Sequence, residues 1–281
     1  GIGAALVSQL RAQGGTVLAL GRQTQPALDY TAEATVAACA QHVAAQLSQA
    51  GLPLTRLIVA TGFLHGTTAS GQHAEPERSW QHLNADALAH GFAVNAVGPA
   101  LVMKHFLPLL PRQGRCVAAF LSARVGSIGD NALGGWYGYR ASKAALNQLV
   151  HTAAIELARR NRDALCVALH PGTVDTGLSK PFAKNGLQVR PTDEAASDLL
   201  AVIDSLPVGS SGQHQPGTIG RYPVSAVRTQ FCAQRPPAGG LPGLWLHTQG
   251  RRAQWPGGLP GGAGRRRPGC GAAATGGGTR A

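Results

Sequence analysis

A phenol and an ammonium group stand four residues apart in this chain, on Tyr139 and Lys143. They lie in a run, 137–160, that reads as a helix, and residues i and i+4 share one helical face. A phenol with a pKa of about 10 is a poor acid or base near neutrality, but a cation beside it favours the phenolate and lowers that pKa. The pair therefore suits proton transfer to or from a carbonyl or alcohol oxygen, although the same spacing also occurs on ordinary surface helices.

The segments around this pair predict a parallel sheet with helices on both faces. Short β-rich runs alternate with longer amphipathic runs, which is typical of α/β domains. The predicted strands are 16–20, 56–60, 116–121 and 165–169. The predicted helices are 4–11, 32–50, 85–110, 137–160 and 192–204. We therefore expect a Rossmann-like, doubly wound α/β fold over residues 1–206.

The chain opens on Gly1-Ile2-Gly3, directly before the predicted helix 4–11. In a dinucleotide-binding unit, glycines after the first strand let the backbone approach a pyrophosphate, and the next helix points its N-terminus at that charge. Because these glycines stand at the start of the sequence, we expect the first strand of the unit to be missing. A plain helix N-terminus with two glycines is the alternative.

Composition changes abruptly after residue 206. All 13 acidic residues precede residue 213, whereas residues 213–281 hold 9 of the 25 Lys and Arg, 16 of the 38 Gly and 8 of the 18 Pro. Few apolar residues recur there, so we expect a disordered Gly/Pro/Arg-rich tail over 207–281. A basic arm for nucleic acid is one explanation of the charge. Since Gly, Pro and Arg have GC-rich codons, we favour an out-of-frame extension over a nucleic-acid partner.

The remaining composition argues against several other classes of protein. The five cysteines are scattered, with no C-x-x-C pair, so neither a zinc site nor a disulfide scaffold is indicated, and a reducing cytoplasm fits best. No uninterrupted apolar run is long enough to cross a bilayer. The polar stretch containing His73, Glu75, Glu77 and His82 is interpreted as a solvated loop, and no metal site is predicted.

Several motifs resemble the classical short-chain dehydrogenase/reductase family in order and approximate spacing. They are Gly1-Ile2-Gly3, Asp29, Asn95, Tyr139, Lys143 and Pro171-Gly172-Thr173-Val174-Asp175-Thr176. The stretch 122–143 is similar to the branch that contains C-factor-like and sniffer-like carbonyl reductases. The resemblance implies an NAD(P)-dependent enzyme that interconverts a small carbonyl compound and an alcohol, working as a homodimer or homotetramer. A catalytically impaired binding or signalling protein on the same scaffold is the alternative.

The resemblance also implies roles for three residues in catalysis. Tyr139 would be the general acid/base for the substrate oxygen. Lys143 would lower the Tyr139 pKa and hydrogen-bond the nicotinamide ribose. Asn95 would hold a bend in its helix and a water molecule used for proton relay; an Asn that satisfies backbone groups inside a helix would look the same in the sequence.

The family serine has no direct match in this chain. It usually stands second in a Ser-Ser pair at the end of a strand, where this chain has Ala123. Ser122 is the preferred substitute, although successive side chains of a strand point in opposite directions. Ser127, beyond the turn, stays open as the other candidate.

The cofactor is predicted to be NADP rather than NAD. Arg22 follows the strand 16–20 with no acid at the strand end, and an Arg can neutralise a 2′-phosphate where a carboxylate would bind a 2′-hydroxyl. The other cofactor-binding residues implied by the resemblance are Gly1, Ile2, Gly3, Asp29, Ala60, Thr61, Gly62, Tyr139, Lys143, Pro171, Gly172, Val174 and Thr176. Substrate specificity is expected in the segment 177–191, with Phe63 and Trp136 as further candidates for a mostly apolar pocket.

Overall fold

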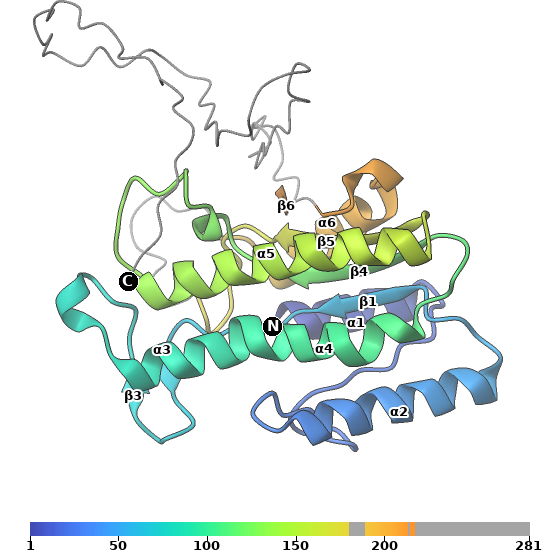
Figure 1. Ribbon diagram of the computed structural model, residues 1–281, viewed down its shortest axis with the longest axis horizontal. Helices are drawn as coiled ribbons and strands as arrows, with labels where there is room; N and C mark the ends of the chain where they lie inside the picture. The colour runs from blue at the N-terminus through green and yellow to red at the C-terminus, as the bar shows by residue number, and fades with distance from the viewer. Residues whose placement is uncertain (180–188, 213, 217–281) are drawn as a thin grey trace, which may run out of the picture. The chain divides into compact units, whose positions relative to one another are not determined.

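The computed structural model describes residues 1–179, 189–212 and 214–216 (Figure 1). The predicted specificity segment 177–191 and the predicted tail 207–281 therefore lie partly outside the described residues. The expected α/β fold, with a parallel sheet between helices, is confirmed.

In the described residues, four parallel strands form the central sheet in the order β1-β4-β5-β6. They are β1 (Arg56–Val59), β4 (Cys116–Leu121), β5 (Ala164–His170) and β6 (His214–Pro216). A short antiparallel pair, β2 (Gly66–Thr67) with β3 (His73–Ala74), is separate from this sheet. Because all four strands run in the same direction, their carboxyl ends meet at one edge, where ligands of open α/β sheets bind.

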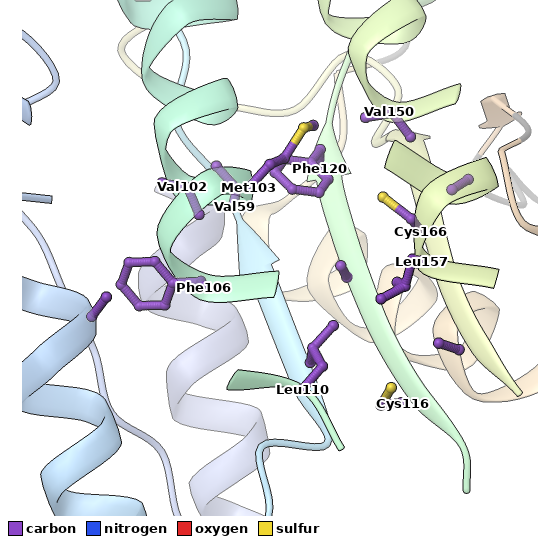
Figure 2. Close-up of a cluster of buried hydrophobic side chains, with 14 of the residues drawn as sticks. Val59, Val102, Met103, Phe106, Leu110, Cys116, Phe120, Val150, Leu157 and Cys166 are labelled. Atoms are coloured by element: carbon purple, nitrogen blue, oxygen red, sulfur yellow. The ribbon is translucent and has the colours of Figure 1, made fainter. Parts of the chain in front are cut away.

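One face of the sheet is covered by α2 (Glu33–Ala50), α4 (Gly98–Phe106) and α5 (Tyr137–Arg160). Phe120 of β4 is fully buried there, in one apolar cluster with Met103 of α4 and Cys166 of β5 (Figure 2). This cluster fixes α4 and α5 against the central strands.

The other face is covered by α1 (Ile2–Ala12) and α6 (Thr192–Ser205). Neighbouring residues of β4, such as Val117 and Ala119, point to this side, whereas Ala118 and Phe120 point to the first. Burial on both faces explains why β4 and β5 read as continuous apolar runs rather than alternating ones.

The predicted helix 85–110 is one helical run with a change of winding inside it. It begins as α3 (Ala85–Phe92), passes through a π-helical turn at Ala93–Val97, continues as α4 and ends in the 3₁₀ turn Leu107–Leu109. Among the described residues, the run Ala85–Leu109 is the single helix long and apolar enough to span a membrane. Its contacts with α2 and α5 are those of a helix in a protein core.

The predicted strand 16–20 is wrong: the structure assigns no strand there. A strand needs a neighbour that completes its hydrogen-bond ladder, and among the described residues β1 pairs only with β4. Leu20 still packs against the core, whereas Leu18 is 40% exposed. The apolar run therefore indicated the burial of Leu20. It could not indicate whether another strand would pair with 16–20.

The described domain continues past residue 206, the boundary that composition suggested. A 3₁₀ turn at Val208–Ser210 leads to β6. The backbone of Cys166 in β5 bonds to this extension, since its oxygen accepts from Gly212 N at 2.8 Å and its nitrogen donates to Ser211 Oγ at 3.1 Å. The rest of the predicted tail, residues 213 and 217–281, lies outside the described residues.

Candidate active site at the carboxyl edge of the sheet

The segments that follow β1, β4 and β5 begin at the same edge of the sheet. They start at Ala60, Ser122 and Pro171, each of which directly follows the last residue of its strand. The N-terminus of α1 also reaches this edge, because a Cβ built on Gly3 would lie 3.5 Å from the Cβ of Ala60. The predicted phosphate turn and the predicted loop 60–62 are therefore neighbours in space.

Tyr139 and Lys143 lie one turn apart near the start of α5, as predicted. The Lys143 ammonium is 5.8 Å from the centroid of the Tyr139 ring, within the range of a cation–π contact. Lys143 is only 2% exposed, and its Nζ donates to the backbone oxygen of Leu121 at 2.9 Å. That bond ties the lysine to the carboxyl end of β4.

Burial governs the protonation of both groups. It raises the pKa of Tyr139 to about 12 and lowers the pKa of Lys143 to about 8, because a buried site disfavours the charged form of each. Tyr139 is half-buried, and Lys143 is almost fully buried. Desolvation is the cause of the raised Tyr139 pKa, and the lowering of that pKa by Lys143 stays a prediction.

Asn95 occupies the π-helical turn and is fully buried. Its Oδ1 accepts from Phe63 N at 2.8 Å, while its Nδ2 donates to Phe63 O at 2.8 Å and to Ser142 Oγ at 3.0 Å. The Ser142 hydroxyl in turn donates to the backbone oxygen of Tyr139 at 3.0 Å. π-Helical turns are frequent at functional sites, and this one ties the loop after β1 to the first turns of α5.

Gly62 lies beside Asn95 and Lys143. A Cβ built on it would stand 3.7 Å from both Asn95 Oδ1 and Lys143 Nζ. Gly62 is exposed, whereas Asn95 and Lys143 are buried. The loop thus leaves solvent-accessible space directly beside two buried polar side chains.

The predicted serine, Ser122, bonds to a later turn of α5 than the one that carries Tyr139. Ser122 is 4% exposed, and its hydroxyl donates to Asn147 Oδ1 on α5 at 2.7 Å. Ser127 is half-buried after the 3₁₀ turn Arg124–Gly126. Ala123 is buried and has no hydroxyl to offer. A role for either serine at the substrate oxygen stays a prediction.

The residues predicted to bind the adenosine half lie in two loops. Arg22 is exposed on a concave surface formed by residues 19–24. The Asp29 carboxylate accepts from the backbone and hydroxyl of Thr31, which lowers the pKa of Asp29, with a smaller contribution from the Arg22 charge. Thr61 donates its hydroxyl to the Tyr30 hydroxyl at 3.3 Å, which links the Asp29 loop to the end of β1.

The turn after β5 is built as the sequence suggested. Gly172 has a φ of 78°, a left-handed conformation that favours glycine. Val174 is buried and pairs with Arg190 in an isolated parallel bridge. The Thr176 amide donates to Ser179 Oγ at 3.2 Å. Beyond it, His65 Nε2 lies 3.1 Å from Gly177 O, so this turn contacts the loop after β1.

Sequence reasoning missed several residues of this edge, and Glu77 is the main one. The sequence predicts a solvated loop around it, and His73 and Glu75 are indeed exposed, with His73 Nε2 2.9 Å from Glu75 Oε1. Glu77, in contrast, is 7% exposed and lines a small cavity with Tyr139 and Asn95. The pattern of acids could not reveal this burial, because it depends on the approach of the loop to α5.

Comparison with known proteins shows which sequences this chain is similar to. The family model described as short chain dehydrogenase matches residues 1–186. A 1-hydroxy-2-glutathionyl-2-methyl-3-butene dehydrogenase of Rhodococcus sp. (strain AD45) is 31% identical over 207 residues, covering 73% of this chain and 83% of that protein. The C-signal protein of Myxococcus xanthus is 36% identical over 126 residues, covering 45% of this chain and 72% of that protein.

Solved structures show the same fold. An NADPH-bound carbonyl reductase from chicken fatty liver superimposes with a TM-score of 0.61 at 24% identity, covering 79% of this chain and 95% of that one. The carbonyl reductase Sniffer of D. melanogaster superimposes with a TM-score of 0.58 at 21% identity, covering 76% of this chain and 80% of that one. These likenesses concern the arrangement of helices and strands.

Proposed function

The chain belongs to the short-chain dehydrogenase family of NAD(P)-dependent oxidoreductases, and we propose that it reduces a small apolar carbonyl compound to an alcohol with NADPH. The observation that carries the proposal is the meeting of Tyr139, Lys143 and Asn95 beside the exposed Gly62. Polar groups of these three kinds, gathered at the carboxyl edge of a parallel sheet, suit proton transfer to a substrate oxygen.

The described residues fit a dinucleotide. Helix α1 begins without a side-chain cap and without an acid in its first turn, so its free N–H groups suit a pyrophosphate. Arg22 would bind a 2′-phosphate, and Asp29 would contact the adenine. Lys143 would hydrogen-bond the nicotinamide ribose, and the turn 171–176 would contact the nicotinamide amide. When bound, the cofactor would supply the hydride for reduction or accept it for oxidation.

The proton for the alcohol would come from Tyr139. Burial raises the pKa of Tyr139 to about 12, so the phenol is protonated at neutral pH and holds the proton that a carbonyl oxygen would take, although by itself it is a weak acid. Lys143, with a pKa of about 8, is mostly an ammonium at pH 7 and would favour the phenolate that forms. The hydrogen bonds from Asn95 to Ser142, and from Ser142 to the Tyr139 backbone oxygen, would keep the phenol in place.

Cofactor choice has its own test. We expect Arg22→Glu to weaken NADPH binding relative to NADH binding by at least about tenfold, because a carboxylate repels a 2′-phosphate and accepts from a 2′-hydroxyl. The control is Arg112→Glu, an equal charge change at an exposed position before β4, at the opposite edge of the sheet. Fluorescence titration with each nucleotide gives both dissociation constants. Equal effects of the two variants on both nucleotides would contradict the assignment of Arg22.

Turnover is tested with a panel of substrates. NADPH consumption would be followed with small apolar aldehydes and ketones, and NADP reduction with a glutathione-conjugated alcohol of the kind for which the Rhodococcus relative is named. Product analysis must show one alcohol formed for each NADPH consumed. Saturable NADPH binding without turnover of any compound would instead favour the second candidate, a signalling protein like the C-signal relative, which the alanine at position 123 would suit.

A further inference from the structure

Glu77 is a buried carboxylate that the proposed reaction does not use. It lies between β3 and the 3₁₀ turn Trp80–His82, and it is 7% exposed. Among the described residues, no cationic side chain forms an ion pair with it. A buried carboxylate without a cation is unfavourable unless fixed donors or dipoles compensate it, so its place in the fold calls for a reason.

The carboxylate lies at the N-terminus of α5, the helix that carries Tyr139. Its Oε1 and Oε2 are each 3.2 Å from Gly138 N, so the side chain accepts from one of the free amides of the first turn. The backbone oxygen of Glu77 accepts from Trp136 N at 2.6 Å. Glu77 therefore holds the chain on both sides of Tyr137, immediately before Tyr139. The positive end of the helix dipole provides the compensation that a buried carboxylate needs.

The local backbone depends on this contact. Trp136 has a φ of 53°, and it is the one non-glycine residue among those described with a positive φ. Such strain persists only where the surroundings hold the residue in place. Gly138 has no side chain where one would collide, because a Cβ there would lie 2.9 Å from Glu77 Oε1. Both features indicate that the start of α5 is shaped around Glu77.

Tyr139 is coupled to this start. The Trp136 and Tyr139 rings meet edge to face with centroids 6.2 Å apart. Glu77, Gly138 and Tyr139 line one small cavity together with Asn95. A shift of the first turn of α5 would therefore move the phenol relative to the substrate oxygen, and displacements of about 1 Å can lower a rate about a hundredfold.

We propose that Glu77 is a positioning residue, which caps α5 and fixes the turn at Trp136 so that the Tyr139 hydroxyl is aimed at the substrate oxygen. This inference rests on the proposed function, since it needs Tyr139 to be the proton donor. It predicts a loss in kcat without a loss in NADPH binding, because the α1 N-terminus and Arg22 lie on other elements.

The test compares three variants of Glu77 in the full chain. Glu77→Ala removes the acceptor, and we expect kcat to fall at least about tenfold with the NADPH dissociation constant within about twofold of the unaltered protein. Glu77→Gln keeps an acceptor for Gly138 N and should retain kcat within about threefold. Glu77→Asp keeps the charge, but its side chain is one methylene shorter, so the carboxylate lies farther from Gly138 N. We expect this variant to fold and to have a lower kcat.

The matched control is Arg115→Ala. The Arg115 guanidinium donates to Leu206 O and Ile203 O, so it satisfies the C-terminal end of α6 beside the amino end of β4, away from Tyr139. It should lower the melting temperature without lowering kcat. The inference is overturned if Glu77→Ala keeps the unaltered kcat, or if Glu77→Ala and Arg115→Ala lower kcat alike.

A Tyr139→Phe arm separates this inference from the proposed function. Loss of turnover in Tyr139→Phe with full turnover in all Glu77 variants would refute the role of Glu77 alone. Turnover that survives Tyr139→Phe would refute the proposed function and, with it, any positioning of that phenol.

Discussion

At the scale of single residues, burial sets the chemistry of the candidate site. Tyr139 and Lys143 lie one helical turn apart. Burial raises the pKa of Tyr139 and lowers the pKa of Lys143, so it favours the neutral form of both. The hydrogen bond from Lys143 Nζ to Leu121 O replaces part of the hydration that the ammonium loses on folding. A charge held in this way favours function at the expense of stability.

Replacing Lys143 should therefore stabilise the fold. Its pKa falls from 10.5 to about 8 on folding, so between these values the unfolded chain binds more protons, and stability rises with pH. The cost of burying the ammonium is complete below about pH 8 and vanishes above 10.5. We expect Lys143→Met to raise the free energy of unfolding at pH 7 by about 1–2 kcal/mol, after the loss of the bond to Leu121, and to abolish turnover.

Urea unfolding at several pH values between 7 and 10.5 checks this expectation. The gain should shrink as the pH rises through that window. Lys104→Met is the control, since Lys104 is exposed and paired with Glu33, and its effect should not vary in the same way. A Lys143→Met variant less stable than the unaltered protein at pH 7 would contradict the account.

At the scale of elements, glycines set how closely the helices approach their neighbours. Gly98 begins α4 directly after the π-helical turn, and the ring of Tyr30 lies where its side chain would be. Tyr30 also accepts from Thr61 at the end of β1. The position of the Asn95 turn thus depends on a contact between α4 and the Asp29 loop.

A substitution at Gly98 should break this contact. A Cβ there would lie 2.1 Å from the Tyr30 ring, so we expect Gly98→Ala to lower the free energy of unfolding by about 2–3 kcal/mol. The cost should be smaller in a Tyr30→Ala background, because the two sites interact. Gly91→Ala on α3, where a Cβ would meet nothing within 4 Å, is the control and should leave stability unchanged or improved. Additive effects of Gly98→Ala and Tyr30→Ala in denaturant unfolding would contradict this reading.

The sequence predicted the elements better than the contacts between them. Tyr139 and Lys143 lie on one helix as expected, since their spacing needs only local geometry. The strand 16–20 failed because pairing requires a neighbour that periodicity cannot report. The burial of Glu77 and the raised pKa of Tyr139 also depend on tertiary packing. Composition marked the change after residue 206 but could not show that β6 still pairs with β5.

At the scale of the whole molecule, we expect a homodimer or homotetramer formed through the predicted helices 85–110 and 137–160, the second of which is α5. Ile155 of α5 is 47% exposed and Val97, beside α4, is 49% exposed. Apolar side chains on the outer surfaces of these helices suit a self-complementary interface.

We expect Ile155→Lys to lower the molecular mass in solution, because an ammonium buried in an interface without an opposite charge is unfavourable. Light scattering at micromolar concentration measures the mass. Ile128→Lys is the control, since Ile128 is 86% exposed in the loop before α5 and should leave the mass unchanged. A mass unaffected by Ile155→Lys would place the interface elsewhere.

In the proposed reaction, the Tyr139 hydroxyl delivers the proton to the substrate oxygen. The most direct measurement is kcat for NADPH-dependent reduction by Tyr139→Phe beside Tyr137→Phe, which removes the same atom two residues earlier on the same helix. We expect Tyr139→Phe to lose at least about a hundredfold in kcat with NADPH binding intact, and Tyr137→Phe to stay within about threefold. Equal activity of the two variants would contradict the assignment.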